Sequence, residues 1–216
     1  MRKKLVRFQE IKSRKNIIEP GTPLYENIKG NWHQFFQNEQ PIVLELGCGK
    51  GEYTTGLATI APGKNYIGVD VKGDRIWAGS TMALEKELHA VAFLRTQIQH
   101  LEEFFAPGEV SEIWITFPDP RPKVRDIKRR LTSPRFLGVY QNILKQAGKI
   151  HVKTDNKDLF DYTLEILRAK GVDNLVHTFD LYRTDMQYQL PPIQTNFEKV
   201  YLSEGIPIKY LSFSFF

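Results

Sequence analysis

The sequence lacks several features on which whole classes of protein depend. Its one cysteine, Cys48, excludes an intramolecular disulfide, and its cysteine and histidine residues do not have the spacing of zinc ligands. No apolar run approaches the roughly 18 residues that a membrane-spanning helix needs. The basic residues after Met1 are not followed by the apolar stretch of a secretory signal. We therefore expect a cytoplasmic protein with no metal and no membrane partner.

Internal repeats, low-complexity tracts and linkers are also missing from the sequence. A chain of 216 residues is long enough for one sizeable core and short for two. Its composition, 41% hydrophobic and 25% charged, is that of a globular protein. We expect a single domain over residues 1–216, with a basic N-terminal arm over about residues 1–19.

The net charge of +5 is modest, but its distribution is uneven. Residues 1–15 carry +6 and residues 119–135 carry +5, which leaves −6 for the remainder. Two basic segments on an acidic body predict a polyanionic partner. For the arm, a solvated segment is an open alternative. Under that alternative, deletion of residues 1–15 would cost little.

Short apolar runs that alternate with helix-like segments indicate the fold class. The five predicted strands are residues 42–46, 66–70, 91–94, 112–117 and 149–153. Near-continuous apolar runs of this length are typical of a parallel sheet that is covered on both faces. Ser133 and Pro134 predict the N-cap and first position of a helix, and Asp158 predicts a further cap.

The C-terminal part of the chain has a different pattern. Residues 175–182 and 208–216 are predicted strands with no clear helix between them. They indicate an antiparallel addition to the sheet. The predicted fold class is α/β: a doubly wound, mostly parallel seven-stranded, Rossmann-like sheet with helices on both faces and an antiparallel C-terminal strand.

A glycine-rich loop follows the first predicted strand. Gly47, Gly49 and Gly51 allow a tight turn and bring a ligand close to bare main chain. The G-x-G-x-G spacing differs from that of dinucleotide-binding loops, and a plain turn is the alternative. Glu45 ends the first strand and Asp70 ends the second, where a carboxylate can accept both hydroxyls of a ribose. Together they predict a site for a nucleotide-like cofactor.

A stiff acidic loop follows the fourth predicted strand. Asp119 lies between Pro118 and Pro120, and ligands of open α/β sheets bind beyond the carboxyl ends of strands. A carboxylate can accept from N1–H and the exocyclic amine of guanine, and the lysines and arginines of residues 121–130 can hold phosphates. The alternative is a proline-rich turn with a solvated basic tail.

The glycine loop with Glu45 and Asp70 resembles the cofactor site of class I methyltransferases, with NAD as the competing ligand. Further segments, F-P-D-P-x-P-K, K-R-R-L-T-S-P, K-T-D-N and T-N-F-E-K, resemble those of bacterial tRNA (guanine-N7)-methyltransferases over nearly the whole chain. The resemblance implies a class I methyltransferase fold, S-adenosylmethionine as methyl donor, S-adenosylhomocysteine as product, and guanine-46 of the tRNA variable loop as target. It implies no obligatory protein partner, and the chain would be a monomer or homodimer.

The same resemblance implies roles for particular residues. The implied cofactor-binding residues are Glu45, Gly47, Gly49, Gly51, Asp70, Gln97 and Asp119. Asp119 is also the implied catalytic residue. The implied substrate-binding residues are Lys123, Asp155, Thr195, Asn196, Phe197 and Glu198.

Two positions depart from the family pattern: Arg121 replaces the usual tryptophan, and Gln97 replaces the usual aspartate near the adenine. Guanine N7 has a lone pair and no proton, so we expect Asp119 to orient the base and not to act as a general base. A methyltransferase for another substrate is one alternative, which the basic segments disfavour. A catalytically silent RNA-binding protein is the other, which the retained Glu45, Asp70 and Asp119 disfavour.

Overall fold

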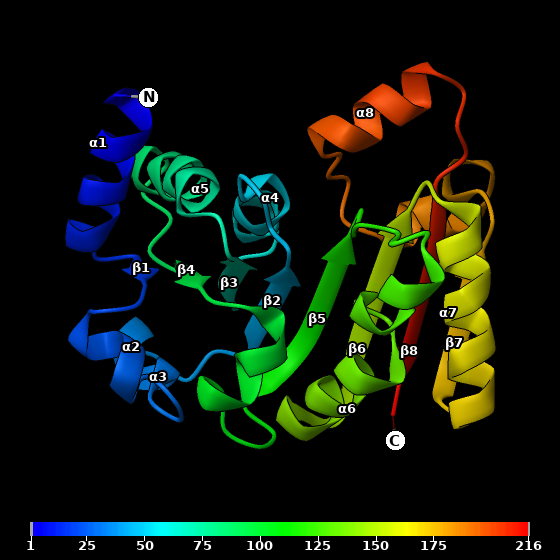
Figure 1. Cartoon of the computed structure of the whole chain (residues 1–216), viewed down its shortest axis with the longest axis horizontal. Coiled ribbons are helices and arrows are strands. Elements are labelled where there is room, and N and C mark those ends of the chain that lie inside the picture. The colour runs from blue at the N-terminus through cyan, green and yellow to red at the C-terminus, as the bar shows by residue number, and fades with distance from the viewer. Residues whose placement is uncertain (1, 216) are drawn as a thin grey trace.

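The computed structural model describes residues 2–215, with side chains from residue 6 onward. Eight strands of this part form one sheet, in the order β1-β4-β3-β2-β5-β6-β8-β7 (Figure 1). They are β1 (Ile17–Ile18), β2 (Ile42–Leu46), β3 (Asn65–Asp70), β4 (Val91–Arg95), β5 (Val110–Thr116), β6 (Leu144–Thr154), β7 (Asp173–Thr178) and β8 (Lys209–Ser214). The pairs from β1 to β6 are parallel, and β8 is antiparallel to β6 and β7.

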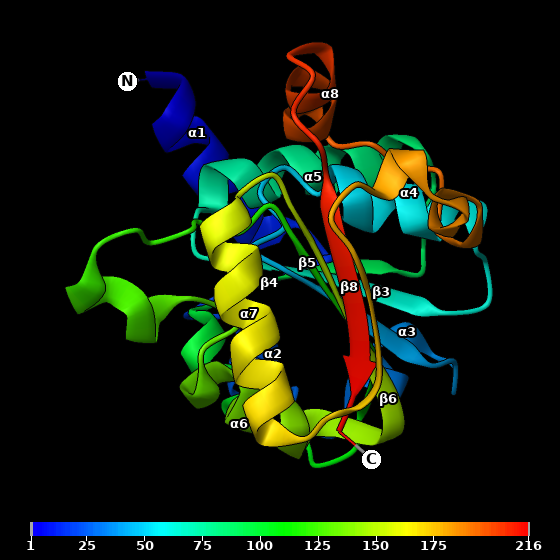
Figure 2. The same cartoon turned by 90° about the vertical axis from the view of Figure 1, so that its right-hand side faces the viewer.

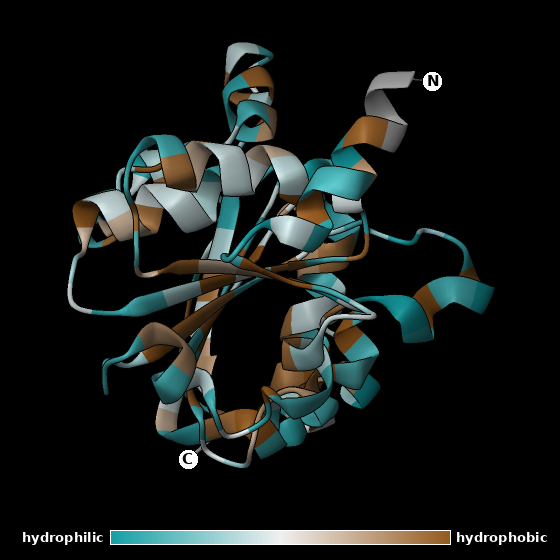
Figure 3. Ribbon diagram, turned by 90° about the vertical axis from the view of Figure 1, so that its left-hand side faces the viewer, coloured by the Kyte–Doolittle hydropathy of each residue, from teal (hydrophilic) through white to brown (hydrophobic). Residues whose placement is uncertain are grey.

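Helices cover both faces of the sheet (Figures 1 and 2). They are α1 (Arg2–Glu10), α2 (Pro23–Asn27), α3 (Trp32–Phe36), α4 (Glu52–Ile60), α5 (Gly73–Glu85), α6 (Pro134–Ile143), α7 (Lys157–Lys170) and α8 (Asn196–Ser203). One core joins α2, α3, α6 and α7 to one face and contains Leu44; the other joins α4 and α5 to the opposite face and contains Val43. This alternation along β2 is the reason why the strand is apolar throughout. Figure 3 shows the hydrophobic strands between the two layers of helices.

The predicted α/β class with a mostly parallel sheet is confirmed, but the sheet has one strand more than predicted. The addition is β1, which pairs Ile17 with Phe93 and Ile18 with Leu94 at the edge of the sheet. A strand of two residues has no periodicity to detect, so the sequence pattern did not indicate it.

The prediction of no helix between the last two strands was wrong. The helix α8 lies there, beyond the carboxyl ends of the strands and apart from the helices that cover the faces (Figures 1 and 2). Thr195 caps it, because its hydroxyl oxygen accepts the main-chain N–H of Glu198 at 3.2 Å. The helix has only eight residues, and Phe197 and Val200 are exposed on it, so its helical periodicity is too short to stand out from the sequence.

One of the two predicted helix caps was wrong. The cap of α7 is Asn156, whose side chain accepts the N–H of Leu159 at 2.8 Å, and Asp158 lies inside the first turn. Ser133 and Pro134 do occupy the predicted N-cap and first positions of α6, but the Ser133 hydroxyl donates to the carbonyl of Lys128 at 3.1 Å and forms no capping hydrogen bond with the helix.

The N-terminal segment packs against α5, so the solvated-arm alternative is wrong for residues 7–14. Ile11 is fully buried. The guanidinium groups of Arg7 and Arg14 lie 4.5 and 4.8 Å from the centroid of the Trp77 ring. Arg14 also donates to the carbonyl of Trp77 at 3.1 Å. The positive charges of Arg7 and Arg14 therefore interact with Trp77 of the protein itself. In the described part of the chain, no helix is long and apolar enough to span a bilayer.

Candidate active site

The three glycines after β2 have different roles in their loop. All adopt left-handed backbone, with φ of +74° at Gly47, +56° at Gly49 and +70° at Gly51. A Cβ at Gly47 or Gly49 would meet nothing within 4 Å, whereas one at Gly51 would lie 2.6 Å from the ring of Phe93. Gly51 therefore allows close packing of the loop on the sheet. Gly47 and Gly49 leave open space beside bare main chain, where a ligand can approach.

Asp70, at the end of β3, is fixed beside this loop. Its carboxylate is 8% exposed. Oδ2 accepts the N–H of Gly49 at 3.0 Å, and Oδ1 accepts the N–H of Lys72 at 2.9 Å. The loop and the start of α5 thus hold the carboxylate in place before any ligand binds.

Glu45 lies beneath the loop and is buried. One oxygen accepts both the N–H and the hydroxyl of Thr54 on α4, and the other accepts the hydroxyl of Thr116 on β5 at 2.9 Å. Burial raises the pKa of Glu45, and the hydrogen bonds from Thr54 and Thr116 lower it. The effect of burial is larger, and the pKa is about 7. In this arrangement Glu45 joins β2, α4 and β5, and the predicted contact with a cofactor stays a prediction.

A cavity of about 340 Å³ lies at the carboxyl ends of β3 and β4. Val71, Thr96 and Gln97 line it on the strand side, and Pro20 and Tyr25 line it from the N-terminal segment. Gln97 is exposed, and its side-chain oxygen accepts the amide of Gln99 at 3.0 Å. The cavity begins one residue beyond Asp70, so it extends the cofactor site predicted from the glycine loop.

Asp119 lies just beyond β5, the strand that pairs with β2, and its side chain is 60% exposed. The main-chain N–H of Arg121 donates to one carboxylate oxygen at 3.1 Å, and Nε of Arg121 forms an ion pair with the other at 3.1 Å. Phe117 and Arg121 have φ of +49° and +48°, which is uncommon for residues other than glycine. The three prolines and these two residues set the shape of the loop.

The basic segment after Asp119 has both surface and buried members. Lys123, Lys128 and Arg129 are exposed. Arg130 is 7% exposed, donates from Nε to the carbonyl of Pro120 at 3.0 Å and lies 4.5 Å from the ring centroid of Tyr162. The K-R-R run therefore offers two exposed cations, while the third supports the Asp119 loop.

The helix α8 links the glycine loop to the Asp119 loop. Asn196 donates to the carboxylate of Glu52, the first residue of α4, from its main-chain N–H at 2.9 Å and also from its side-chain amide. The ring of Tyr201 lies 5.8 Å from that of Phe117. Phe197 is 63% exposed between these contacts.

Glu198 is fully buried and faces the protein interior. Its Oε1 lies 2.5 Å from Nζ of Lys153 and accepts the hydroxyl of Tyr182 at 2.8 Å, while Oε2 has no hydrogen-bond partner. This arrangement gives Glu198 a role in holding α8 on the sheet. Asp155 is half-buried at the end of β6, where its main-chain carbonyl accepts Nζ of Lys209 at 2.9 Å.

The structure thus brings the predicted site residues together at the carboxyl ends of the strands, in two groups. The first group surrounds the glycine loop, and the second surrounds Asp119 and α8. Sequence reasoning missed Glu52, Lys153 and Tyr182, although a lysine inside an apolar strand is a signal that a buried partner exists. The described residues contain no group of three or more side chains that could hold a metal ion.

Comparisons with solved structures agree with this architecture. An antibiotic-related methyltransferase superposes with a TM-score of 0.61 at 18% identity, over 85% of this chain and 92% of that one. The 16S rRNA methyltransferase KamB also superposes with a TM-score of 0.61, at 13% identity, over 86% of this chain and 93% of that one. At such identities the likeness establishes the fold, and the predicted class I methyltransferase fold is confirmed.

Sequence relatives are much closer. A family model described as "Putative methyltransferase" matches residues 39–210. The chain is 48% identical to the tRNA (guanine-N(7)-)-methyltransferase of Cytophaga hutchinsonii, over 99% of this chain and 98% of that protein. It is 49% identical to the tRNA (guanine-N(7)-)-methyltransferase of Christiangramia forsetii, over 97% of this chain and 96% of that protein. The chain therefore belongs to the tRNA (guanine-N7-)-methyltransferase family.

Proposed function

We propose that this protein transfers a methyl group from S-adenosylmethionine to N7 of guanine-46 in the variable loop of tRNA. The observation that carries the proposal is the placement of two sites on adjacent strands. The open glycine loop follows β2, Asp119 follows β5, and α8 contacts the elements on both sides. A methyl donor and an acceptor base can therefore meet between them.

The residues of the first group fit the cofactor. The space beside Gly47 and Gly49 admits a ligand to the main chain, and Asp70 is held where it can accept the ribose hydroxyls. Gln97, in the adjoining cavity, can hydrogen-bond the adenine. When bound, the cofactor supplies a sulfonium-activated methyl group.

The residues of the second group fit a guanine. Arg121 occupies both carboxylate oxygens of Asp119, one by a main-chain hydrogen bond and the other by an ion pair, and guanine can offer N1–H and its exocyclic amine to the same two oxygens. The base would replace Arg121 on the carboxylate and release the guanidinium for a phosphate. Asp119 would then orient N7 and stabilise the positive charge of the methylated ring. Lys123, Asp155, Asn196 and Phe197 would contact the RNA.

The test is transfer of labelled methyl from S-adenosylmethionine to unmodified tRNA, followed by nucleoside analysis. We expect N7-methylguanosine with the natural tRNA and no product when guanine-46 is replaced by adenine. Label in another base would indicate another substrate, and tRNA binding without transfer would indicate an RNA-binding protein. A cytoplasmic location, a single domain and a monomer or homodimer without an obligatory protein partner are part of the proposal.

A further inference from the structure

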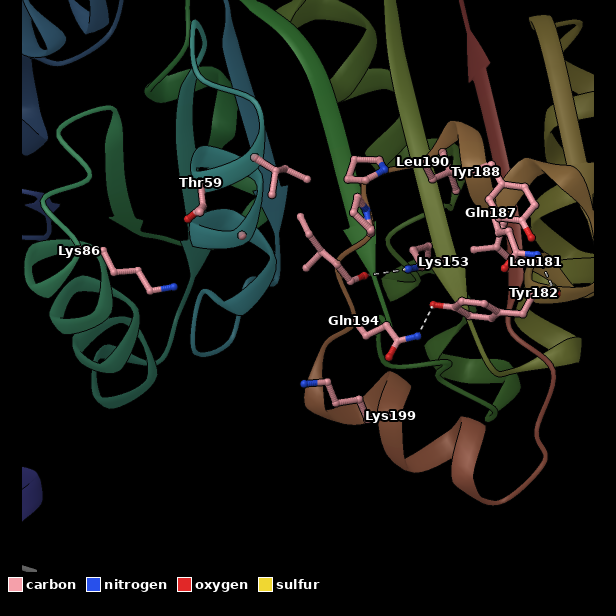
Figure 4. A pocket seen from close by; sticks show the side chains of 15 residues that line it. Thr59, Lys86, Lys153, Leu181, Tyr182, Gln187, Tyr188, Leu190, Gln194 and Lys199 are labelled. Atoms are coloured by element: carbon pink, nitrogen blue, oxygen red, sulfur yellow. Dashed lines mark hydrogen bonds between the residues drawn. The ribbon is translucent and has the colours of Figure 1, made fainter.

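A second cavity, of about 560 Å³, lies beside the second group of site residues. It is bounded by α4, the end of α5, residues 181–194 and Lys199 of α8 (Figure 4). It shares none of its lining with the glycine loop, Asp70 or Asp119. The proposed reaction leaves this cavity without a role.

The charge of the cavity is of one sign. Lys86, Lys153 and Lys199 line it, and no aspartate or glutamate does. Lys153 is paired with buried Glu198, but neither Lys86 nor Lys199 forms an ion pair with any residue that the structure describes. In Figure 4 the side chain of Lys86, which directly follows α5, and that of Lys199 on α8 extend into the space between the two helices. Two exposed, unpaired ammonium groups beside a hollow are suited to an anion.

The remaining walls are mostly apolar and aromatic, with Thr59, Gln187 and Gln194 as the uncharged polar members. Tyr188 is 81% exposed at the cavity, and Leu190, Pro191 and Pro192 form a surface beside it. Single-stranded nucleic acid is commonly held by a ring on which a base stacks and by cations that contact the backbone. The cavity combines both features in one place.

The position of the cavity also relates it to the guanine site. Gln194 and Lys199 line the cavity and flank Thr195–Glu198, the segment at the start of α8. Tyr182 lines the cavity too, and its hydroxyl donates to Glu198 and accepts the amide of Gln194 at 3.1 Å. Tyr182, Gln194 and Lys199 thus form a wall that separates the cavity from the proposed RNA contacts on α8. A nucleotide joined to the target guanine by one phosphate must lie close to that wall.

We propose that this cavity is a second nucleotide subsite, which holds an RNA nucleotide next to the methylated guanine. Its base stacks on Tyr188, and its phosphates contact Lys86 and Lys199. The proposal rests on the proposed function and extends it, because it names a part of the RNA that the chemistry at N7 does not require. The cavity contributes to binding of the RNA and not to methyl transfer.

The first experiment measures binding of unmodified tRNA at a series of salt concentrations. The double variant Lys86→Ala/Lys199→Ala should lower the slope of log affinity against log salt by about two, or roughly one for each lost phosphate contact. KM for tRNA should rise with kcat little changed, because the reacting groups stay in place. The matched control is Lys145→Ala/Lys149→Ala, which removes two exposed lysines from the opposite end of the sheet.

The second experiment places 2-aminopurine beside the target guanine and follows its fluorescence. Stacking in the cavity should quench the signal on binding, and Tyr188→Ala should abolish most of the quenching. A Lys86/Lys199 variant with the slope and KM of the control would overturn the subsite. In that case the wild-type protein would still methylate tRNA. Failure of the wild type to methylate would overturn the proposed function instead, so the two failures are distinguishable.

Discussion

The two groups of site residues differ in how far they are organised without a ligand. In the first group, around the glycine loop and called the cofactor half below, Glu45 and Asp70 are at most 8% exposed. Both carboxylate oxygens of each residue accept hydrogen bonds from elsewhere in the protein. In the second group, around Asp119 and α8 and called the substrate half below, the Asp119 side chain is 60% exposed. Among the described residues, only Arg121 contacts its carboxylate. The carboxylates beside the glycine loop are fixed by the fold, whereas Asp119 is open to solvent.

This difference suits the two ligands. A small cofactor offers few contacts, so its site gains most from groups that are already fixed. A tRNA offers many phosphates, and their binding can drive the displacement of Arg121. An exposed ion pair contributes only about 0–1 kcal/mol, so the displacement costs little.

The largest expected effect comes from the buried ion pair that holds α8. Lys153→Met leaves Glu198 buried without a cation, which should lower the free energy of unfolding by about 3–5 kcal/mol. Urea unfolding measures this, and Lys153→Met/Glu198→Gln should recover part of the loss. The control is Lys157→Met, which breaks the exposed pair with Asp161. Equal losses in the two single variants would show that burial of the pair has no energetic consequence.

The second prediction concerns the pH dependence of the cofactor half. The pKa of Glu45 is about 7 in the folded protein and about 4.5 when unfolded, so the folded state binds the proton more tightly. This contribution to stability is therefore largest below about pH 4.5 and is lost as the pH rises through about 7. Relative to Glu45→Gln, the wild type should lose up to about 3 kcal/mol between pH 5 and 8. Parallel stability curves for the two proteins would contradict this.

The third prediction concerns the substrate half. Asp119→Ala should reduce single-turnover methylation by roughly 10² or more, because a misplaced base loses its alignment with the methyl group. Asp119→Asn should be nearly as damaging, since its amide presents a donor where an acceptor is needed. The melting temperature should change little, because the carboxylate is exposed. A near-normal rate in folded Asp119→Ala would remove this residue from the mechanism.

The smallest effect is expected at Asp70. Asp70→Ala should weaken binding of S-adenosylmethionine by about 1–3 kcal/mol, the usual cost of a lost charge-assisted hydrogen bond. Titration calorimetry measures this directly. The variant should bind tRNA normally if the two halves are independent. Weaker tRNA binding would show that the cofactor half also organises the substrate half.

The sequence predicted where the glycine loop, Glu45 and Asp70 lie, because the signals for the strands are local, and their contacts with a cofactor stay predictions. Each apolar run lies close to an observed strand, Glu45 and Asp70 lie within the last two residues of β2 and β3, and the loop glycines follow β2. A strand fixes the place of the residue that ends it. The same rule placed Asp119 correctly at the end of β5.

The substrate half was predicted less well because it depends on tertiary contacts. Glu198 was expected to contact substrate, but it forms a pair with Lys153, 45 positions earlier in the chain. Arg130 was grouped with exposed cations, but its guanidinium packs on Tyr162. The sequence around Glu198 and Arg130 does not show that these charges are buried, because the partner of each comes from a distant segment.

The short strand β1 has a consequence for how the chain is made. Its partner β4 is about 75 residues further along, so Ile17 and Ile18 leave the ribosome long before they can pair. They are therefore available as soon as β4 forms, and they pair with a strand whose main chain would otherwise be an open edge for a strand of another molecule. Removal of the first 18 residues would leave that edge of β4 open.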